Sequence, residues 1–306
     1  MDSGLRHFLV GALALAFAVV AFGCGSERTP APERIEPAES ASGGSSTESA
    51  FAEATAGSSI TNAGEPEKPA LPSAPDFPSE PTPLEVEGYN PASHVGPDDR
   101  ESWPKPVVVV LHGNFDRPEW ECTKWKTVAG FHGWILCPRG IRTPWATLEE
   151  DRWTYRGSGA TAKEVSATID ALDQRYPGRV SRDQTVLVGF SLGAILAPPI
   201  ARSEPERYPY VFLVEGGGKM IERPWIAAMK KAGVEAVGLA MSLPHLRNKA
   251  LKAVPRFERA GIRAVFVDMR GAGHGYRDDF AITGKRALEQ MVSPDKGDAG
   301  PDGEGG

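Results

Sequence analysis

The stretch that most constrains the fold runs from residue 185 to residue 197, Thr-Val-Leu-Val-Gly-Phe-Ser-Leu-Gly-Ala-Ile-Leu-Ala. Its β-branched start predicts a buried strand, and helix-compatible apolar residues begin at Leu192. Between them, Gly189-Phe-Ser191-Leu-Gly193 matches G-x-S-x-G in strand–turn–helix context. The glycines allow a turn sharp enough to lift the serine hydroxyl clear of the sheet edge, with the Leu192 N–H free to donate to an oxyanion. The alternative is an ordinary strand-to-helix turn.

Apolar strands and helices alternate along residues 84–293, which we expect to form the folded domain. Strands are predicted at 107–111, 134–137, 185–189, 210–214, 236–241 and 264–268, and helices at 120–130, 162–176, 192–202, 224–232, 246–260 and 278–291. This alternation predicts a mainly parallel sheet with helices on both faces. Ligands in such sheets bind beyond the carboxyl ends of the strands. Four polar residues follow predicted strands and should share that edge: His112, Ser191, Glu215 and His274.

Three motifs together resemble those of α/β hydrolases: Val-Val-Val-Val-Leu-His-Gly-Asn at 107–114, Gly-Phe-Ser-Leu-Gly at 189–193 and Gly-Ala-Gly-His-Gly at 271–275. Their order and spacing are similar to the dienelactone-hydrolase and carboxylesterase/phospholipase-like branch, over nearly all of the folded domain. The resemblance implies a serine hydrolase that cleaves an ester through an acyl-enzyme, with no cofactor. It also implies a second oxyanion donor, the N–H of Asn114 or of Phe115. The sequence has no metal-binding or nucleotide-binding motif, so neither is expected.

His274 is the candidate general base among the six histidines. It lies in a glycine-rich segment after the last predicted strand, where small residues would let the loop reach back to Ser191. An imidazole with a pKa near 6.5 is able to take the serine proton and return it to a leaving group. His245, at the end of a strand, is the rival, and a glycine-rich surface turn is the alternative for the segment.

The acid that would orient the base is less well defined. The family usually has an Asp after the strand that here covers residues 237–241, but Ser-Leu-Pro-His follows it. Some α/β hydrolases draw the acid from the strand after the nucleophile helix, and Glu215 closes that strand. An unpaired buried carboxylate is costly, so we expect Glu215 to have a partner. Asp268, at the end of the strand before His274, is the second choice, and a structural role is the alternative for Glu215.

The N-terminus has the pattern of an export signal over residues 1–23. The apolar run of residues 8–22 falls short of the ~20 residues that span a bilayer. It ends in Ala-Phe-Gly-Cys24, which resembles a bacterial lipoprotein signal cleaved before Cys24, with that cysteine lipidated. Ordinary cleavage or an uncleaved anchor is the alternative. Either way, we expect the rest of the chain to be exported to the cell envelope, and the lipid would attach it to a membrane.

Composition distinguishes the segments on either side of residues 84–293 from the predicted folded domain. Residues 24–83 are rich in Ser, Pro, Ala and Glu and predict a disordered linker, and the Gly- and Asp-rich residues 294–306 predict a frayed tail. The net charge of −6 argues against a nucleic-acid partner. Cys122 opens the predicted helix at 120–130, and Cys137 ends the strand that follows. Both ends should lie on the same rim, which favours a disulfide in an exported protein over two free thiols.

Two other functions are compatible with these residues. A non-catalytic surface protein of the same fold would keep the pocket for binding, and the missing Asp motivates it. A peptidase of the same fold would use the same nucleophile. Only a short helix fits between Glu215 and the next strand, so we expect an open site without a large cap domain, suited to small or surface-presented esters.

Overall fold

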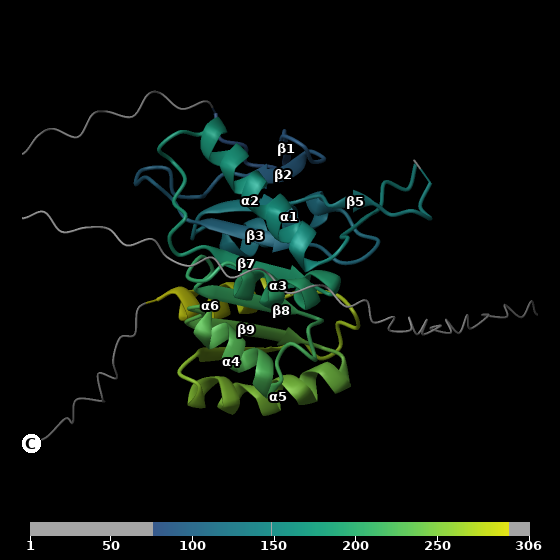
Figure 1. The fold of residues 1–306 in the computed structure, drawn as a ribbon, viewed down its shortest axis with the longest axis vertical. Coiled ribbons are helices and arrows are strands. Elements are labelled where there is room, and N and C mark those ends of the chain that lie inside the picture. The colour runs from purple at the N-terminus through teal and green to yellow at the C-terminus, as the bar shows by residue number, and fades with distance from the viewer. Residues whose placement is uncertain (1–75, 148, 294–306) are drawn as a thin grey trace, which may run out of the picture. The chain divides into compact units, whose positions relative to one another are not determined.

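The computed structural model describes residues 76–147 and 149–293, and their centre is an eight-stranded sheet (Figure 1). In spatial order its strands are β1 (Thr82–Leu84), β2 (Ala92–Val95), β4 (Trp134–Cys137), β3 (Val107–Leu111), β7 (Val186–Phe190), β8 (Tyr210–Val214), β9 (Ala236–Met241) and β10 (Arg263–Asp268). The pairs β1–β2 and β2–β4 are antiparallel, and the pairs from β4 to β10 are parallel. The strands β5 (Ile141–Arg142) and β6 (Trp153–Thr154) form a separate small hairpin.

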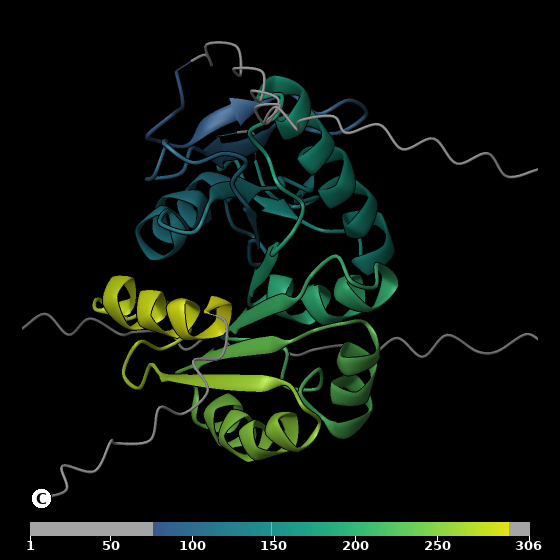
Figure 2. The ribbon, with the colours of Figure 1, turned by 90° about the vertical axis from the view of Figure 1, so that its left-hand side faces the viewer.

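Helices cover both faces of this sheet (Figure 2). They are α1 (Pro118–Ala129), α2 (Ser158–Arg175), α3 (Leu192–Ser203), α4 (Arg223–Lys231), α5 (Pro244–Arg259) and α6 (Phe280–Val292). Residues of α2, α3, α4 and α5 share one hydrophobic cluster, and residues of α1 and α6 share the other. The structure thus confirms the expected α/β-hydrolase fold, with a mainly parallel sheet between two helical layers.

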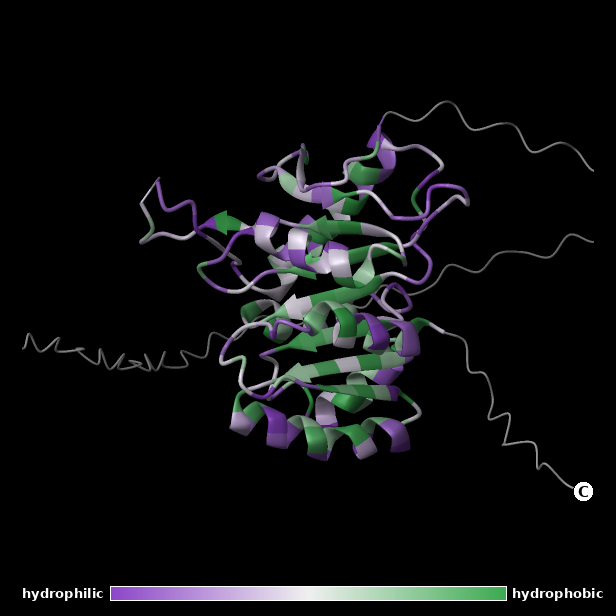
Figure 3. Cartoon of the chain, turned by 180° about the vertical axis from the view of Figure 1, so that it is seen from behind, coloured by the Kyte–Doolittle hydropathy of each residue, from purple (hydrophilic) through white to green (hydrophobic). Residues whose placement is uncertain are grey.

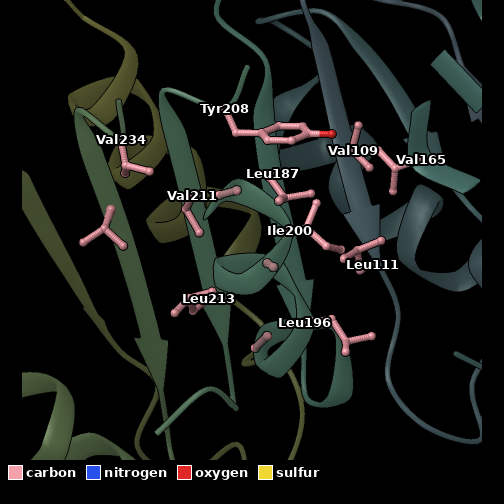
Figure 4. Packing of buried hydrophobic residues seen from close by; sticks show 14 of the residues in the cluster. Val109, Leu111, Val165, Leu187, Leu196, Ile200, Tyr208, Val211, Leu213 and Val234 are labelled. Atoms are coloured by element: carbon pink, nitrogen blue, oxygen red, sulfur yellow. The ribbon is translucent and has the colours of Figure 1, made fainter. Parts of the chain in front are cut away.

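The alternation of side chains along β3 explains why its run of valines is a strand. Val109 and Leu111 pack in the first cluster, while Val108 and Val110 pack in the second. All four side chains are fully buried, as expected for a parallel strand covered on both faces. Figure 4 shows the first cluster between the strands and α3, and Figure 3 shows the apolar strands inside more hydrophilic helices.

The folded part begins earlier than residue 84, the expected start. Strand β1 starts at Thr82, and the Phe77 ring lies 4.9 Å from the Trp103 ring and 5.3 Å from the Trp134 ring, between centroids. The predicted signal, Cys24, nearly all of the linker and the C-terminal tail lie outside the described residues. No helix among residues 76–293 is long and apolar enough to cross a membrane.

Candidate active site

The turn at Ser191 has a backbone conformation that few residues other than glycine adopt. Ser191 lies between β7 and α3 with φ 52° and ψ −105°. Its N–H donates to the carbonyl of Val214, 2.9 Å away, which fixes the turn against β8. A non-glycine residue in a sparsely populated region costs about 1–3 kcal/mol, and such strain gathers at functional sites.

The flanking glycines are required by close backbone contacts. A Cβ atom on Gly193 would lie 2.1 Å from the carbonyl oxygen of Leu111, and one on Gly189 would lie 2.2 Å from the carbonyl carbon of Gly193. Strand β3, the turn and α3 therefore touch through their main chains. This contact gives the G-x-S-x-G spacing its physical reason.

We expect Gly193→Ala to lower the free energy of unfolding by about 3 kcal/mol, because neither the β3 backbone nor the turn has room to move. Urea unfolding followed by circular dichroism measures this. Gly159→Ala is the matched control: it lies in the first turn of α2, and its added Cβ would meet no atom within 4 Å. An equal loss of stability in both variants would contradict this account of the turn.

His274 lies next to the serine. Its Nε2 atom is 2.8 Å from the Ser191 Oγ, a hydrogen-bond distance, although 83 residues separate the two. His274 is in the loop after β10, where Gly271 has φ 92° and Gly273 has φ 65°, values that suit glycine. Half of the imidazole side chain is exposed (49%), so a ligand has access to this pair from solvent.

Glu215 lies behind the imidazole. Its side chain is fully buried, and its Oε2 atom is 3.6 Å from Nδ1 of His274. The other oxygen, Oε1, accepts a hydrogen bond from the N–H of Ser242, at the end of β9. Among the described residues Oε2 has no hydrogen-bond partner, and it faces the imidazole Nδ1 at 3.6 Å. Distances in unliganded sites are often long and shorten when substrate binds.

Asp268 is engaged elsewhere. Arg247 donates two hydrogen bonds to its carboxylate, at 3.1 and 2.9 Å, and Arg270 forms an ion pair with it at 2.9 Å. The Arg247 guanidinium lowers the pKa of Asp268 below its ordinary value. Of the two acids predicted from sequence, the structure therefore brings Glu215, and not Asp268, to His274.

The loop after β3 carries the second predicted oxyanion donor. The His112 ring is buried, with its nitrogens 2.7 Å from the Gly113 oxygen and 2.9 Å from the Arg139 oxygen, and burial lowers its pKa. The Asn114 side-chain oxygen accepts a hydrogen bond of 2.7 Å from Thr154. These bonds fix the loop and indicate a structural role for His112.

The first predicted oxyanion donor is the first residue of α3. Leu192 follows Ser191 directly, and N–H groups in the first turn of a helix have no acceptor within that helix. Phe115, the alternative to Asn114, has φ 61° and is half-buried. The roles of Leu192, Asn114 and Phe115 toward an oxyanion stay predictions.

A buried polar network that the sequence did not reveal holds the histidine loop. The Tyr276 hydroxyl donates to Oε2 of Glu121 at 2.6 Å and accepts from the indole N–H of Trp125 at 3.0 Å. The Tyr276 ring stacks on Phe190, 5.2 Å between centroids, and Phe190 lies 5.4 Å from the His274 ring. Tyr276 thus attaches the glycine-rich loop to α1 two residues after the base.

Burial dominates the electrostatics of this network. Glu121 is 3% exposed, and removal from water raises the pKa of its carboxyl to about 8. Burial also raises the pKa of Tyr276, with the Glu121 charge as the second cause, so the phenol keeps its proton. The only sequence signal was an acid four residues before Trp125, on the face of α1 that packs inward.

Cys122 and Cys137 are joined in the structure, with their Cα atoms 6.0 Å apart. Both are fully buried and tie α1 to β4, one residue from Glu121. The histidine loop therefore docks on a helix that is itself linked to the sheet.

We expect the variant Cys122→Ala/Cys137→Ala to be about 3 kcal/mol less stable than the wild-type chain, because the bond closes a loop of 15 residues. Urea unfolding with and without reductant measures the loss, and reductant should have no effect on the variant. Peptide mapping under non-reducing conditions is the direct check. Free thiols at both cysteines in the purified, unreduced chain would contradict the bond.

Among residues 76–147 and 149–293, no group of three or more His, Cys, Asp or Glu side chains is placed to hold a metal ion. At Ser191 the structure places an oxygen at the tip of a turn, an imidazole beside it and a buried carboxylate behind the imidazole. Such an arrangement is able to activate a hydroxyl as a nucleophile.

Comparison with known proteins extends the description of the fold. No protein-family model matches the sequence, and no curated protein matches it. An uncharacterized protein from Bacillus cereus ATCC 10987 is similar in structure, with a TM-score of 0.51 and 15% identity over 63% of this chain and 61% of that one. A Bacillus cereus carboxylesterase has a TM-score of 0.45 and 17% identity, over 65% of this chain and 93% of that one. An acylaminoacyl peptidase from Pyrococcus horikoshii has a TM-score of 0.44 and 13% identity, over 70% of this chain and 40% of that one. At these identities the likeness concerns the fold alone.

Proposed function

We propose that this chain is a serine hydrolase that cleaves a carboxylic ester. The observation that carries the proposal is the 2.8 Å between Ser191 Oγ and His274 Nε2, with the serine held in a strained turn at the start of a helix. A surface protein that only binds ligands has no need of that strain, which costs stability.

The reaction follows from the placement of these groups. His274 Nε2 takes the proton from Ser191 Oγ as that oxygen attacks the ester carbonyl carbon. The N–H groups of Leu192 and Asn114 stabilise the negative oxygen of the tetrahedral intermediate. When the intermediate collapses, the ester C–O bond breaks and the imidazolium protonates the departing alkoxide.

Deacylation repeats these steps with water. His274 removes a proton from water, the hydroxide attacks the acyl carbon, and Ser191 leaves with the proton returned by the imidazolium. Glu215 keeps Nδ1–H pointed toward itself and stabilises the imidazolium in both halves.

A fluorophosphonate probe with intact-mass and peptide analysis tests the proposal. We expect one adduct, on Ser191, and turnover of 4-nitrophenyl esters by the wild-type chain. Ser191→Ala should lose both, and Ser242→Ala, a serine outside the proposed nucleophile turn, should keep the adduct. A folded wild-type chain that neither reacts nor turns over an ester would support the non-catalytic binding protein instead. Faster turnover of matched amides than of esters would support the peptidase.

We also propose, from the sequence of residues 1–24, that the chain is exported and anchored through a lipid on Cys24. Expression in a bacterium with an alkyne-tagged fatty acid tests this. The wild-type chain should carry the tag and fractionate with membranes. Cys24→Ala should carry no tag, and equal labelling of both chains would contradict the anchor.

A further inference from the structure

A groove lies between α4 and α5, outside the Ser191–His274 pair. One cavity of about 470 Å³ is lined by residues of both helices and of the loop before α4. A second cavity of about 250 Å³ shares Arg223 and Arg256 with it, so the two form one depression. We call this depression the α4–α5 groove. The lining residues used below are Gly218, Glu222, Arg223, Lys249, Lys252, Arg256 and Arg259.

The groove is strongly positive. Four cations, Lys249, Lys252, Arg256 and Arg259, recur at three- and four-residue spacing and thus lie on one face of α5, over about 15 Å. Arg223 lines the groove from α4. Figure 3 shows hydrophilic residues along this helix, the lowest in the view.

Within residues 76–147 and 149–293, little of this charge is neutralised by carboxylates. The one carboxylate in the lining, Glu222, lies 3.6 Å from Lys249. Within the described residues, Arg223, Lys252, Arg256 and Arg259 form no ion pair with a carboxylate. Like charges at helical spacing repel each other, and they gather here in a chain of net charge −6. An anion would remove that repulsion, and guanidinium groups bind carboxylate and phosphate well.

One end of the groove adjoins the proposed active site. Gly218 lines it three residues after Glu215, and a Cβ on Gly216 would lie 2.4 Å from the Ser191 carbonyl oxygen. Two residues of extended chain span at most ~7 Å, which limits the separation between Gly216 and Gly218. Helix α5 begins two residues after Ser242, whose N–H binds Glu215. From there, the cationic face of α5 leads away from the serine.

We propose that the α4–α5 groove binds the anionic part of an ester substrate whose scissile carbonyl lies at Ser191, an inference that rests on the hydrolase proposed above. The substrate is an elongated ester with one or more carboxylate or phosphate groups separated from the reacting carbonyl by an apolar chain. Ile221 and Pro224 give the groove an apolar lining for that chain. In a chain of net charge −6, the cations of the α4–α5 groove give such a substrate a positive surface to bind.

The first test compares 4-nitrophenyl half-esters of straight-chain diacids of increasing length with the same compounds methylated on the distal carboxyl. We expect the ratio of kcat/KM, anionic over neutral, to rise once the chain is long enough to reach the groove. The ratio should fall about tenfold in Lys252→Gln/Arg256→Gln, which removes two charges, and also at high ionic strength. Lys163→Gln/Lys231→Gln, which removes two exposed charges outside the groove, should keep the wild-type ratio.

The second test is calorimetric titration of the full chain with inorganic tripolyphosphate. We expect binding that Lys252→Gln/Arg256→Gln abolishes and the control variant retains. If Lys252→Gln/Arg256→Gln hydrolyses the esters with the wild-type ratio of kcat/KM and binds tripolyphosphate like the wild-type chain, the groove is not the substrate site. The proposed hydrolase would then still stand. If the wild-type chain turns over no ester but binds tripolyphosphate through the groove, both proposals fail. The chain would then not be a hydrolase, and the groove would not be its substrate site.

Discussion

Glu215→Gln is expected to lower kcat for ester hydrolysis by about 10⁴-fold, the loss that follows when the acid that orients a catalytic histidine is neutralised. Glutamine keeps an oxygen for the Ser242 N–H, so the turn after β8 should stay in place. It cannot balance the charge of an imidazolium, and its amide favours the wrong tautomer of His274. Steady-state kinetics on a 4-nitrophenyl ester measures the effect.

Asp268→Asn and Glu87→Gln are the matched comparisons. Asp268 is paired with Arg247 and Arg270, and Glu87 is exposed and lies outside the site and the groove. Both variants should keep most of the wild-type kcat. A loss of about 10⁴-fold in Asp268→Asn, with Glu215→Gln still active, would mean that the loop rearranges on substrate binding and that Asp268 orients the base.

Glu121→Gln is expected to remove a large pH dependence of stability. In the folded chain, the Glu121 carboxyl keeps its proton up to about pH 8, whereas in the unfolded chain it loses the proton near its ordinary pKa of 4.5. Between these values the unfolded chain binds fewer protons, so the free energy of unfolding falls as pH rises from about 4.5 to 8. At 1.36 kcal/mol per pKa unit, the fall is of the order of 4–5 kcal/mol.

Urea unfolding at pH 5, 7 and 9 measures this fall. The neutral amide has nothing to ionise and still accepts from Tyr276, so the variant should gain several kcal/mol over the wild-type chain between pH 5 and pH 9. Glu87→Gln, at an exposed position, should follow the wild-type curve. Parallel curves for Glu121→Gln and the wild-type chain would show that the buried carboxyl ionises at its ordinary pKa.

The central strands were predictable because burial on both faces leaves uninterrupted apolar runs in the sequence. Strands β3, β4, β8 and β9 begin and end where the apolar pattern predicts. Strand β2 was not predicted, because Ala-Ser-His-Val has no such run. The side chain of His94 in this strand is buried, and its ring nitrogens are hydrogen-bonded with the Thr82 oxygen and the Tyr176 hydroxyl. Only the fold brings these partners together.

The set of polar residues at the carboxyl edge of the sheet was predictable for a different reason. Residues that follow parallel strands lie at the same edge whatever their distance in sequence, so the strand pattern alone predicts that Ser191, Glu215 and His274 lie together. The choice between Glu215 and Asp268 needed the positions of Arg247 and Arg270. The contact of Glu121 with Tyr276 spans 155 residues and leaves no periodic trace in the sequence.

The short connection between β8 and β9 has a consequence for turnover. The 21 residues between Val214 and Ala236 hold α4, a helix of nine residues, and the imidazole stays half exposed. In the hydrolase proposed above, water would therefore reach the acylated serine without the opening of a lid. We expect the covalent steps to limit turnover, so a higher solvent viscosity, set with glycerol, should leave kcat unchanged.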